Sequence, residues 1–161
     1  MYAADQALDI VQIQMWLAAG LSASSCPSLK WLISIGEGIP VQVMHTLQKR
    51  LPHSSLCFGY GPTEAAVYQT CKIFRELGSQ VIDGPVLVGK PLPNTHTYVV
   101  DTQRQPVPVG VSGELLISGV CLARGYLNRP DLTELAFVPN RLMKDAGGYF
   151  SRMYRTGQSL F

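Results

Sequence analysis

A chain of 161 residues is long enough to form one domain with a hydrophobic core. Hydrophobic residues make up 47% and charged residues only 15%, a balance closer to the interior of a larger protein than to a small, well-solvated domain, which suggests a missing neighbour. The net charge of +2 comes without a basic run or aromatic residues interleaved with Lys and Arg, so the composition excludes a nucleic-acid-binding surface.

The first half of the chain predicts alternating helices and strands. Residues 4–19 have apolar residues at helical intervals, and Pro40 opens a second amphipathic stretch. Short apolar runs at 31–35 and 56–60 predict strands, so the order helix, strand, helix, strand favours a parallel pair. The apolar residues expected to face the core are Leu8, Val11, Met15 and Trp16 in the first helix and Met44, Leu47 and Leu51 in the second.

The second half has shorter elements separated by Gly and Pro. We expect the strand at 67–74 to close the first part, and the runs 97–100 and 114–118 to belong to a small antiparallel barrel or sandwich. Asn128 resembles a helix cap before a short helix that starts near Pro130. The sequence therefore predicts an α/β domain at 1–80 and a β-rich domain at 81–161.

The cysteines and the N-terminus favour a reducing, cytoplasmic location. Cys26, Cys57, Cys71 and Cys121 are widely separated, with no Cys-x-x-Cys pair and no histidine at a metal-ligand interval, so we interpret them as small hydrophobic residues. Residues 1–20 contain two aspartates and no positively charged leader, so we expect neither a signal peptide nor a membrane span.

Residues 59–64 (GYGPTE) are the strongest candidate for chemistry. They follow an apolar strand at a Gly-Pro turn, the position where open α/β sheets hold ligands. Tyr60 can stack on a purine, Thr63 can donate a hydrogen bond to a phosphate oxygen, and Glu64 can bind Mg²⁺. An ordinary turn without a ligand is the alternative interpretation of these six residues.

Five further blocks follow downstream in a fixed order. They are 89–94 (GKPLPN), 98–101 (YVVD) with 106–110 (PVPVG), 113–115 (GEL), 123–130 (ARGYLNRP) and 154–157 (YRTG). Together with GYGPTE they resemble the amino-acid adenylation domains of nonribosomal peptide synthetases, which belong to the adenylate-forming (AMP-dependent synthetase and ligase) superfamily. Upstream, residues 32–40 resemble the strand, Gly-Gly-Glu turn and helix of these domains, with Ile35 at the usual place of the first glycine.

The resemblance implies a fold and a reaction. The fold would be part of the family's large subdomain, a parallel α/β layer followed by a small antiparallel β-barrel. The reaction would be the attack of a carboxylate, expected to be an amino acid, on the α-phosphate of ATP in the presence of Mg²⁺, which gives an acyl-AMP and pyrophosphate. A carrier thiol, the phosphopantetheine of a peptidyl carrier domain, would then accept the acyl group. No nucleic acid or membrane is an expected partner.

The resemblance also assigns residues. Tyr60, Gly61, Thr63, Glu64 and Gln158 correspond to nucleotide-binding positions, and Glu64 to the Mg²⁺ ligand. Gln158 replaces an aspartate that accepts hydrogen bonds from both ribose hydroxyls, which lowers the expected nucleotide affinity about ten- to a hundred-fold. The positions that line the acyl pocket correspond to Ile33, Ile35, Gly59, Val67 and Tyr68, and their apolar character favours a hydrophobic or aromatic substrate side chain.

Other expected parts are not found in the 161 residues. No Gly-, Ser- and Thr-rich loop ends in Pro-Lys-Gly, and no small C-terminal subdomain with a catalytic lysine follows the YRTG block. We therefore expect a truncated adenylation domain that is inactive alone, so no catalytic residue is assigned and whether the chain is itself an enzyme stays open. A partial acyl-CoA ligase and a non-catalytic binding or structural protein remain the alternatives.

Overall fold

The computed structural model describes residues 7–83, 88–144 and 147–160, and it divides the chain into two compact units. The first unit contains residues up to Gly61 and residues 70–90, and the second contains residues 62–69 and everything after Lys90. Residues 62–69 thus group with the second unit, although they precede the last strands of the first. The domain organisation expected from the sequence, 1–80 and 81–161, remains a prediction.

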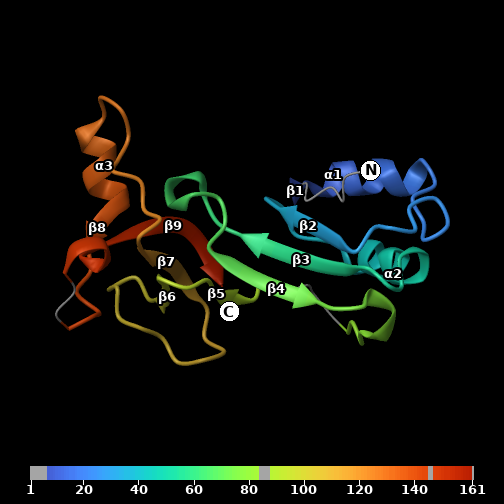
Figure 1. The fold of residues 1–161 in the computed structure, drawn as a ribbon. Coiled ribbons are helices and arrows are strands. Elements are labelled where there is room, and N and C mark those ends of the chain that lie inside the picture. The colour runs from blue at the N-terminus through green and yellow to red at the C-terminus, as the bar shows by residue number, and fades with distance from the viewer. Residues whose placement is uncertain (1–6, 84–87, 145–146, 161) are drawn as a thin grey trace. The chain divides into compact units, whose positions relative to one another are not determined.

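A mixed five-stranded sheet forms the centre of the first unit (Figure 1). Its first three strands are parallel, and the fourth is antiparallel to the third. The parallel pair expected at 31–35 and 56–60 is confirmed. In sheet order the strands are β1 (Ala7–Leu8), β2 (Trp31–Ile35), β3 (Ser55–Tyr60), β4 (Thr70–Phe74) and β5 (Lys90–Pro91).

Helix α2 (Val41–Arg50) follows the sequence prediction, since Met44, Leu47 and Leu51 are all buried. Helix α1 (Ile10–Ala18) differs, because its buried residues are Ile10, Ile13 and Leu17. The helix expected at 4–19 begins only at Ile10, since Leu8 lies in strand β1. The face expected from Leu8, Val11, Met15 and Trp16 was therefore wrong, and Val11 and Met15 are more than half exposed. The sequence of this helix carries two overlapping apolar stripes, and packing in the core cluster selects one of them.

The strand expected at 67–74 is shorter, because it begins at Thr70. Ala66 and Val67 both have a left-handed backbone, with φ of 57° and 68°, which cannot continue a strand. This pair ends the 3₁₀ turn Thr63–Ala65 and redirects the chain. The turn brings the chain back, so that β4 runs antiparallel to β3, with Tyr60 opposite Thr70.

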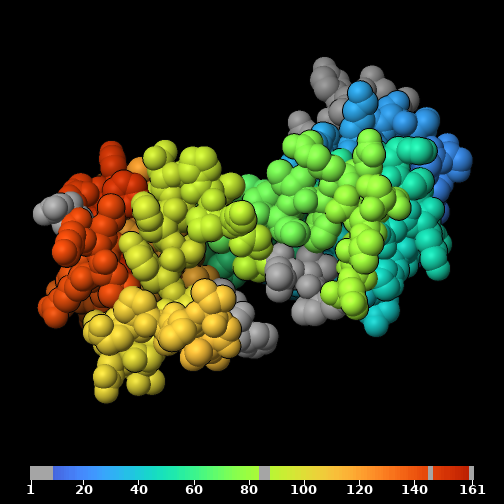
Figure 2. All heavy atoms as spheres, turned by 90° about the horizontal axis from the view of Figure 1, so that it is seen from below, coloured from blue at the N-terminus to red at the C-terminus, as the bar shows by residue number. Residues whose placement is uncertain are grey.

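The second unit contains a four-stranded antiparallel sheet, which confirms an α/β layer followed by an antiparallel β-rich part. Val100, Leu116, Val138 and Met153 form its core. The long loop between its first two strands is exposed at residues 101–106, at the lower left in Figure 2. In sheet order the strands are β6 (Thr95–Val100), β7 (Gly113–Gly119), β9 (Arg152–Leu160) and β8 (Phe137–Pro139).

Helix α3 (Pro130–Ala136) begins one residue later than the cap prediction requires. Arg129 occupies the N-cap position, and Asn128 lies before it with a left-handed φ of 55°. The expectation that Asn128 caps this helix was therefore wrong. The Arg129 guanidinium instead binds the Asp131 carboxylate in the first turn through two hydrogen bonds of 2.9 and 2.7 Å.

Candidate functional site

The GYGPTE run crosses the division between the two units. Tyr60 ends β3 and Gly61 follows it in the first unit, whereas Thr63 and Glu64 lie in the 3₁₀ turn of the second. Thr63 is exposed, and Glu64 is half-buried. The aromatic residue and the carboxylate of the candidate site are therefore carried by different units.

Glu64 is fixed at both its side chain and its backbone. The Tyr126 hydroxyl donates a 2.6 Å hydrogen bond to Glu64 Oε1, and the Ala123 backbone N–H donates a 2.8 Å hydrogen bond to the Glu64 carbonyl. The hydrogen bond from Tyr126 is the main reason that the pKa of the Glu64 carboxyl lies below its ordinary value. Glu64 is thus an ionised, oriented carboxylate at neutral pH.

An aromatic group supports this carboxylate. The ring of Tyr126 packs edge-on against Phe137 at 5.9 Å, and Phe137 packs against Tyr154 at 5.2 Å between ring centroids. Burial raises the pKa of Tyr154, and hydrogen bonds to Tyr126 and Glu64 raise it further, so its hydroxyl stays protonated. The guanidinium of Arg152 lies 5.4 Å from the centre of the Phe137 ring, within the range of a cation–π contact.

Gln69 holds the other end of the 3₁₀ turn. Its buried side chain donates to the Ala65 carbonyl and accepts hydrogen bonds from Thr95 Oγ1 at 2.8 Å and from Cys121 Sγ at 2.7 Å. Burial raises the pKa of the Cys121 thiol, which keeps it protonated as a donor. This network holds the C-terminal end of the 3₁₀ turn that carries Glu64.

Two of the sequence blocks meet in the second sheet. Glu114 of GEL, on β7, forms an ion pair of 3.1 Å with Arg155 of YRTG, on β9, and accepts a 3.3 Å hydrogen bond from the Gly157 backbone. Gln158 follows on β9 and is exposed, and its backbone N–H donates to Thr156 Oγ1 at 3.0 Å. The ribose position predicted for Gln158 therefore lies on a strand that is held in place by its neighbours.

The residues expected to line the acyl pocket are distributed over both units. Ile33 and Ile35 lie half-buried on β2, and Ile35 stands beside Gly59 of β3 in the sheet register. Val67, which is 49% exposed, and Tyr68 follow the 3₁₀ turn in the second unit. The structure thus brings Ile35 and Gly59 together and places Val67 and Tyr68 on a separate segment.

The donor set at Glu64 fits Mg²⁺ bound through a single protein carboxylate. Within the described ranges, no group of three or more His, Cys, Asp or Glu side chains is arranged to hold a metal ion. Mg²⁺ is commonly bound by one or two carboxylates together with waters and the phosphates of a substrate. Glu64, ionised and next to the exposed Thr63, matches such a site.

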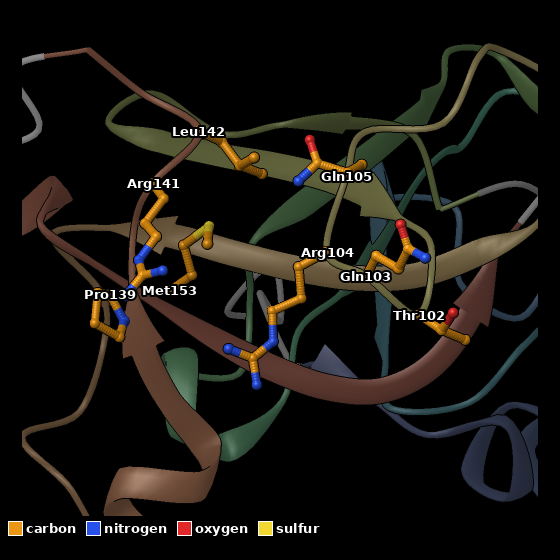
Figure 3. A pocket seen from close by; sticks show the side chains of 8 residues that line it. All are labelled: Thr102, Gln103, Arg104, Gln105, Pro139, Arg141, Leu142 and Met153. Carbon is orange, nitrogen blue, oxygen red and sulfur yellow. The ribbon is translucent and has the colours of Figure 1, made fainter.

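The structure also contains a hollow that involves none of the predicted site residues. It has a volume of about 450 Å³, and its rims carry Arg104 from the loop after β6 and Arg141 from the segment after β8 (Figure 3). Met153, a buried member of the core of the second unit, also lines it. An open hollow of about 740 Å³ lies elsewhere, along residues 124–130, and Tyr126 lines it.

Sequence reasoning gave no role to Tyr126, Tyr154 or Gln69. Tyr126 and Tyr154 belong to the ARGYLNRP and YRTG blocks, which served only as marks of resemblance. The signal that the sequence offers for Tyr126 is the glycine before it, Gly125. The structure explains this glycine, because a Cβ there would lie 2.5 Å from the Thr133 methyl carbon. Gln69 has no such signal, because a glutamine after a turn is normally exposed.

Comparison with known proteins shows the family to which the chain belongs. The chain belongs to the AMP-binding enzyme family, whose family model matches residues 9–127. It is similar to tyrocidine synthase 3 of Brevibacillus parabrevis, with 37% identity over 150 residues, which cover 89% of this chain and 2% of that protein. It is also similar to malpibaldin synthetase of Mortierella alpina, with 43% identity over 135 residues, which cover 83% of this chain and 2% of that protein. The resemblance to adenylation domains of nonribosomal peptide synthetases is confirmed.

Solved structures agree on the fold. The N-terminal subdomain of Klebsiella oxytoca NpsA, in complex with 3-hydroxybenzoyl-AMSN, matches with a TM-score of 0.76 and 22% identity over 94% of this chain and 35% of that one. An NRPS protein containing adenylation and PCP domains, bound to a vinylsulfonamide inhibitor, matches with a TM-score of 0.77 and 26% identity over 94% of this chain and 25% of that one. The chain thus spans about a third or less of the proteins it matches here. No helix in the described part of the chain has the length and apolar character needed to cross a membrane.

Proposed function

We propose that this chain supplies part of the nucleotide and metal site of an adenylation domain, which activates an amino acid or another carboxylic acid as its acyl-AMP. The acyl group would pass to the thiol of a phosphopantetheine carrier. Membership of the AMP-binding family supports the nucleotide, and a structural neighbour that contains both adenylation and PCP domains supports the carrier.

One observation carries the proposal. The carboxylate of Glu64 is ionised and oriented by Tyr126 at 2.6 Å, next to the exposed hydroxyl of Thr63, within the one sequence run that has the composition of a nucleotide site. A carboxylate that is already ionised and held in one direction loses little conformational freedom when it binds a cation. This arrangement therefore favours a binding role for Glu64 over the ordinary-turn alternative.

The proposed roles follow from the charges involved. Joining a carboxylate to an α-phosphate brings two anions together, so binding, orientation and charge stabilisation matter more than a general base. Glu64 would bind Mg²⁺, which neutralises phosphate charge, and Thr63 would donate a hydrogen bond to a phosphate oxygen. Tyr60 would stack on the adenine beside Gly61, and the Gln158 side chain would contact the ribose with one neutral acceptor.

The substrate side chain would meet mostly apolar groups. Ile33, Ile35, Gly59 and Val67 offer no charged partner, and Tyr68 offers only a hydroxyl, so a buried charge on the substrate would remain unpaired. We therefore propose a hydrophobic or aromatic amino acid or aryl acid as the substrate class.

The test is the binding of ATP and Mg²⁺ to the ¹⁵N-labelled 161-residue chain, followed by amide chemical shifts. We expect weak, millimolar affinity with the largest shift changes at residues 60–64, and about tenfold weaker binding in Glu64→Gln. Glu76→Gln, which changes an exposed carboxylate in the first unit, is the matched control and should bind like the wild type.

Each other outcome has a defined meaning. Wild-type affinity in Glu64→Gln would overturn the placement of the metal site. The absence of any ATP-dependent shift in the wild-type chain would overturn nucleotide binding and leave the non-catalytic alternative. Shift changes centred on the Arg104 hollow would move the nucleotide to the cavity of Figure 3.

A further inference from the structure

The segment 123–126 contacts Glu64 at two points. The Ala123 N–H binds the Glu64 carbonyl at 2.8 Å, and the Tyr126 hydroxyl binds Oε1 of the same residue at 2.6 Å. Glu64 and Tyr126 are 62 positions apart in the sequence, and both lie in the second unit. Two contacts from one segment fix both the position of this residue and the direction of its carboxylate.

Tyr126 is itself held rigidly. Its backbone N–H donates a 2.9 Å hydrogen bond to Thr133 Oγ1 of helix α3, and that hydroxyl donates to the Arg129 carbonyl at 2.9 Å. Gly125 permits this close approach, because a Cβ there would lie 2.5 Å from the Thr133 methyl carbon. The Tyr126 ring is also packed against Phe137. The hydroxyl that meets Glu64 therefore has little freedom to move.

Strand β9 also holds the segment 123–126 in place. The Arg152 guanidinium of β9 donates hydrogen bonds of 3.1 Å to the carbonyls of both Ala123 and Arg124. The same guanidinium stacks over Phe137, the ring that packs on Tyr126. The support of Glu64 is therefore anchored in β9 and in helix α3.

The Glu64 carboxylate keeps lone pairs that can bind a cation. An ionised carboxylate has about four lone-pair directions on two oxygens; Tyr126 uses one of them on Oε1, and Tyr154 also hydrogen-bonds to this carboxylate. Oε2 takes no part in that 2.6 Å bond, so a cation can bind it without breaking the contact with Tyr126. Partners that hydrogen-bond a metal-binding carboxylate commonly determine its orientation and its metal affinity.

We propose that Tyr126 is a positioning residue, whose hydroxyl holds the Glu64 carboxylate in the orientation that binds a divalent cation. The inference rests on the proposed function, because it requires Glu64 to be the cation ligand. Tyr126 does not touch the cation in this arrangement; it acts through Glu64, and Phe137 and Thr133 keep it in place.

Tyr126→Phe is the decisive variant, because it removes the hydroxyl and keeps the ring that packs on Phe137. The probe is Mn²⁺ in the presence of ATP, with the dissociation constant taken from the Mn²⁺ electron paramagnetic resonance signal and the site located by paramagnetic broadening of amide signals at 62–69. We expect about tenfold weaker Mn²⁺ binding in Tyr126→Phe and reduced broadening around Glu64. Tyr149→Phe, at a tyrosine that is 71% exposed, should leave both unchanged.

A double-mutant cycle separates this inference from the function on which it rests. If Tyr126 acts through Glu64, Tyr126→Phe has no further effect on Mn²⁺ affinity in the Glu64→Gln background. Weak binding in Glu64→Gln with wild-type binding in Tyr126→Phe, or additive effects of the two changes, would overturn the positioning role alone. Wild-type binding in Glu64→Gln, or no Mn²⁺ binding by the wild type, would overturn the proposed function itself.

Discussion

The Sγ atoms of Cys57 on β3 and Cys71 on β4 lie 2.8 Å apart. The two residues are diagonal neighbours in the antiparallel pair, since Cys57 stands opposite Ile73 and Cys71 opposite Gly59. Both side chains are half-buried. The two cysteines are fourteen residues apart in the sequence, where we interpret them as small hydrophobic residues. The sequence gives no sign that their sulfur atoms lie close together.

This proximity predicts a disulfide under mild oxidation. Sulfur atoms in a disulfide are about 2.05 Å apart, so a small movement of the two side chains suffices. Treatment with diamide should yield a Cys57–Cys71 cross-link in peptide maps without reductant and stabilise the first unit by about 3 kcal/mol, the value for a loop of this length. Cys26→Ser should not change the result. A map that joins Cys57 to any other cysteine would contradict the geometry.

The buried Gln69 network predicts a large loss of stability on truncation. Gln69→Ala leaves the Ala65 carbonyl and the Thr95 hydroxyl without their partner, and each unsatisfied buried group costs about 1–3 kcal/mol. We expect a loss of about 2–4 kcal/mol in the free energy of unfolding of the second unit, measured by amide hydrogen exchange. Gln103→Ala, at an exposed glutamine in the same unit, should cost little. Equal stability of the two variants would show that the network does not hold the turn.

The ion pair at the start of helix α3 predicts that the pKa of Asp131 depends on Arg129. The two hydrogen bonds from Arg129 are the main reason that the pKa of Asp131 lies below its ordinary value of 3.8. A lowered pKa in the folded state contributes stability above pH 3.8, and this contribution is lost as the pH falls through the lowered pKa. Arg129→Gln should return the pKa toward 3.8, measured by NMR titration of the Asp131 carboxyl. An unchanged titration would assign the shift to the helix backbone.

We predict that replacing Gln158 with aspartate strengthens nucleotide binding. A neutral amide offers one acceptor to a ribose diol, whereas a carboxylate accepts two charge-assisted hydrogen bonds. In the proposed site, Gln158→Asp should strengthen ATP binding about tenfold or more, measured by calorimetry in the presence of Mg²⁺. Gln105→Asp adds the same charge in the exposed loop after β6 and should give no gain. An equal gain in both variants would indicate a general effect of charge, and no gain in Gln158→Asp would remove this residue from the ribose position.

Local patterns were enough to predict several elements. Strands β2 and β3 are apolar runs between turn residues that are too short for a helix, and helix α2 has a single apolar stripe that selects its buried face. The GYGPTE run was likewise visible in the sequence, because its residue types are unusual together. Its assignment to nucleotide and metal remains a prediction.

Elements with two equivalent local choices were predicted less well. Helix α1 has two apolar stripes, and only packing in the core of the first unit shows that Ile13 and Leu17 are buried rather than Val11 and Met15. The strand expected from Val67 fails because the chain must reverse at Ala66 and Val67 to pair β4 with β3. Both outcomes depend on neighbours that lie outside the local window.

The sequence by itself therefore determined strands β2 and β3 and helix α2, and it singled out the GYGPTE run, since these depend on residue type and short spacing. Only the tertiary structure decided how Glu64 is held and which cysteines meet. The Tyr126 hydroxyl reaches Glu64 across 62 positions, and Cys57 reaches Cys71 across a strand pair. Such contacts are set by strand register and by the path of the chain between the partners, and no local pattern of residues encodes either one.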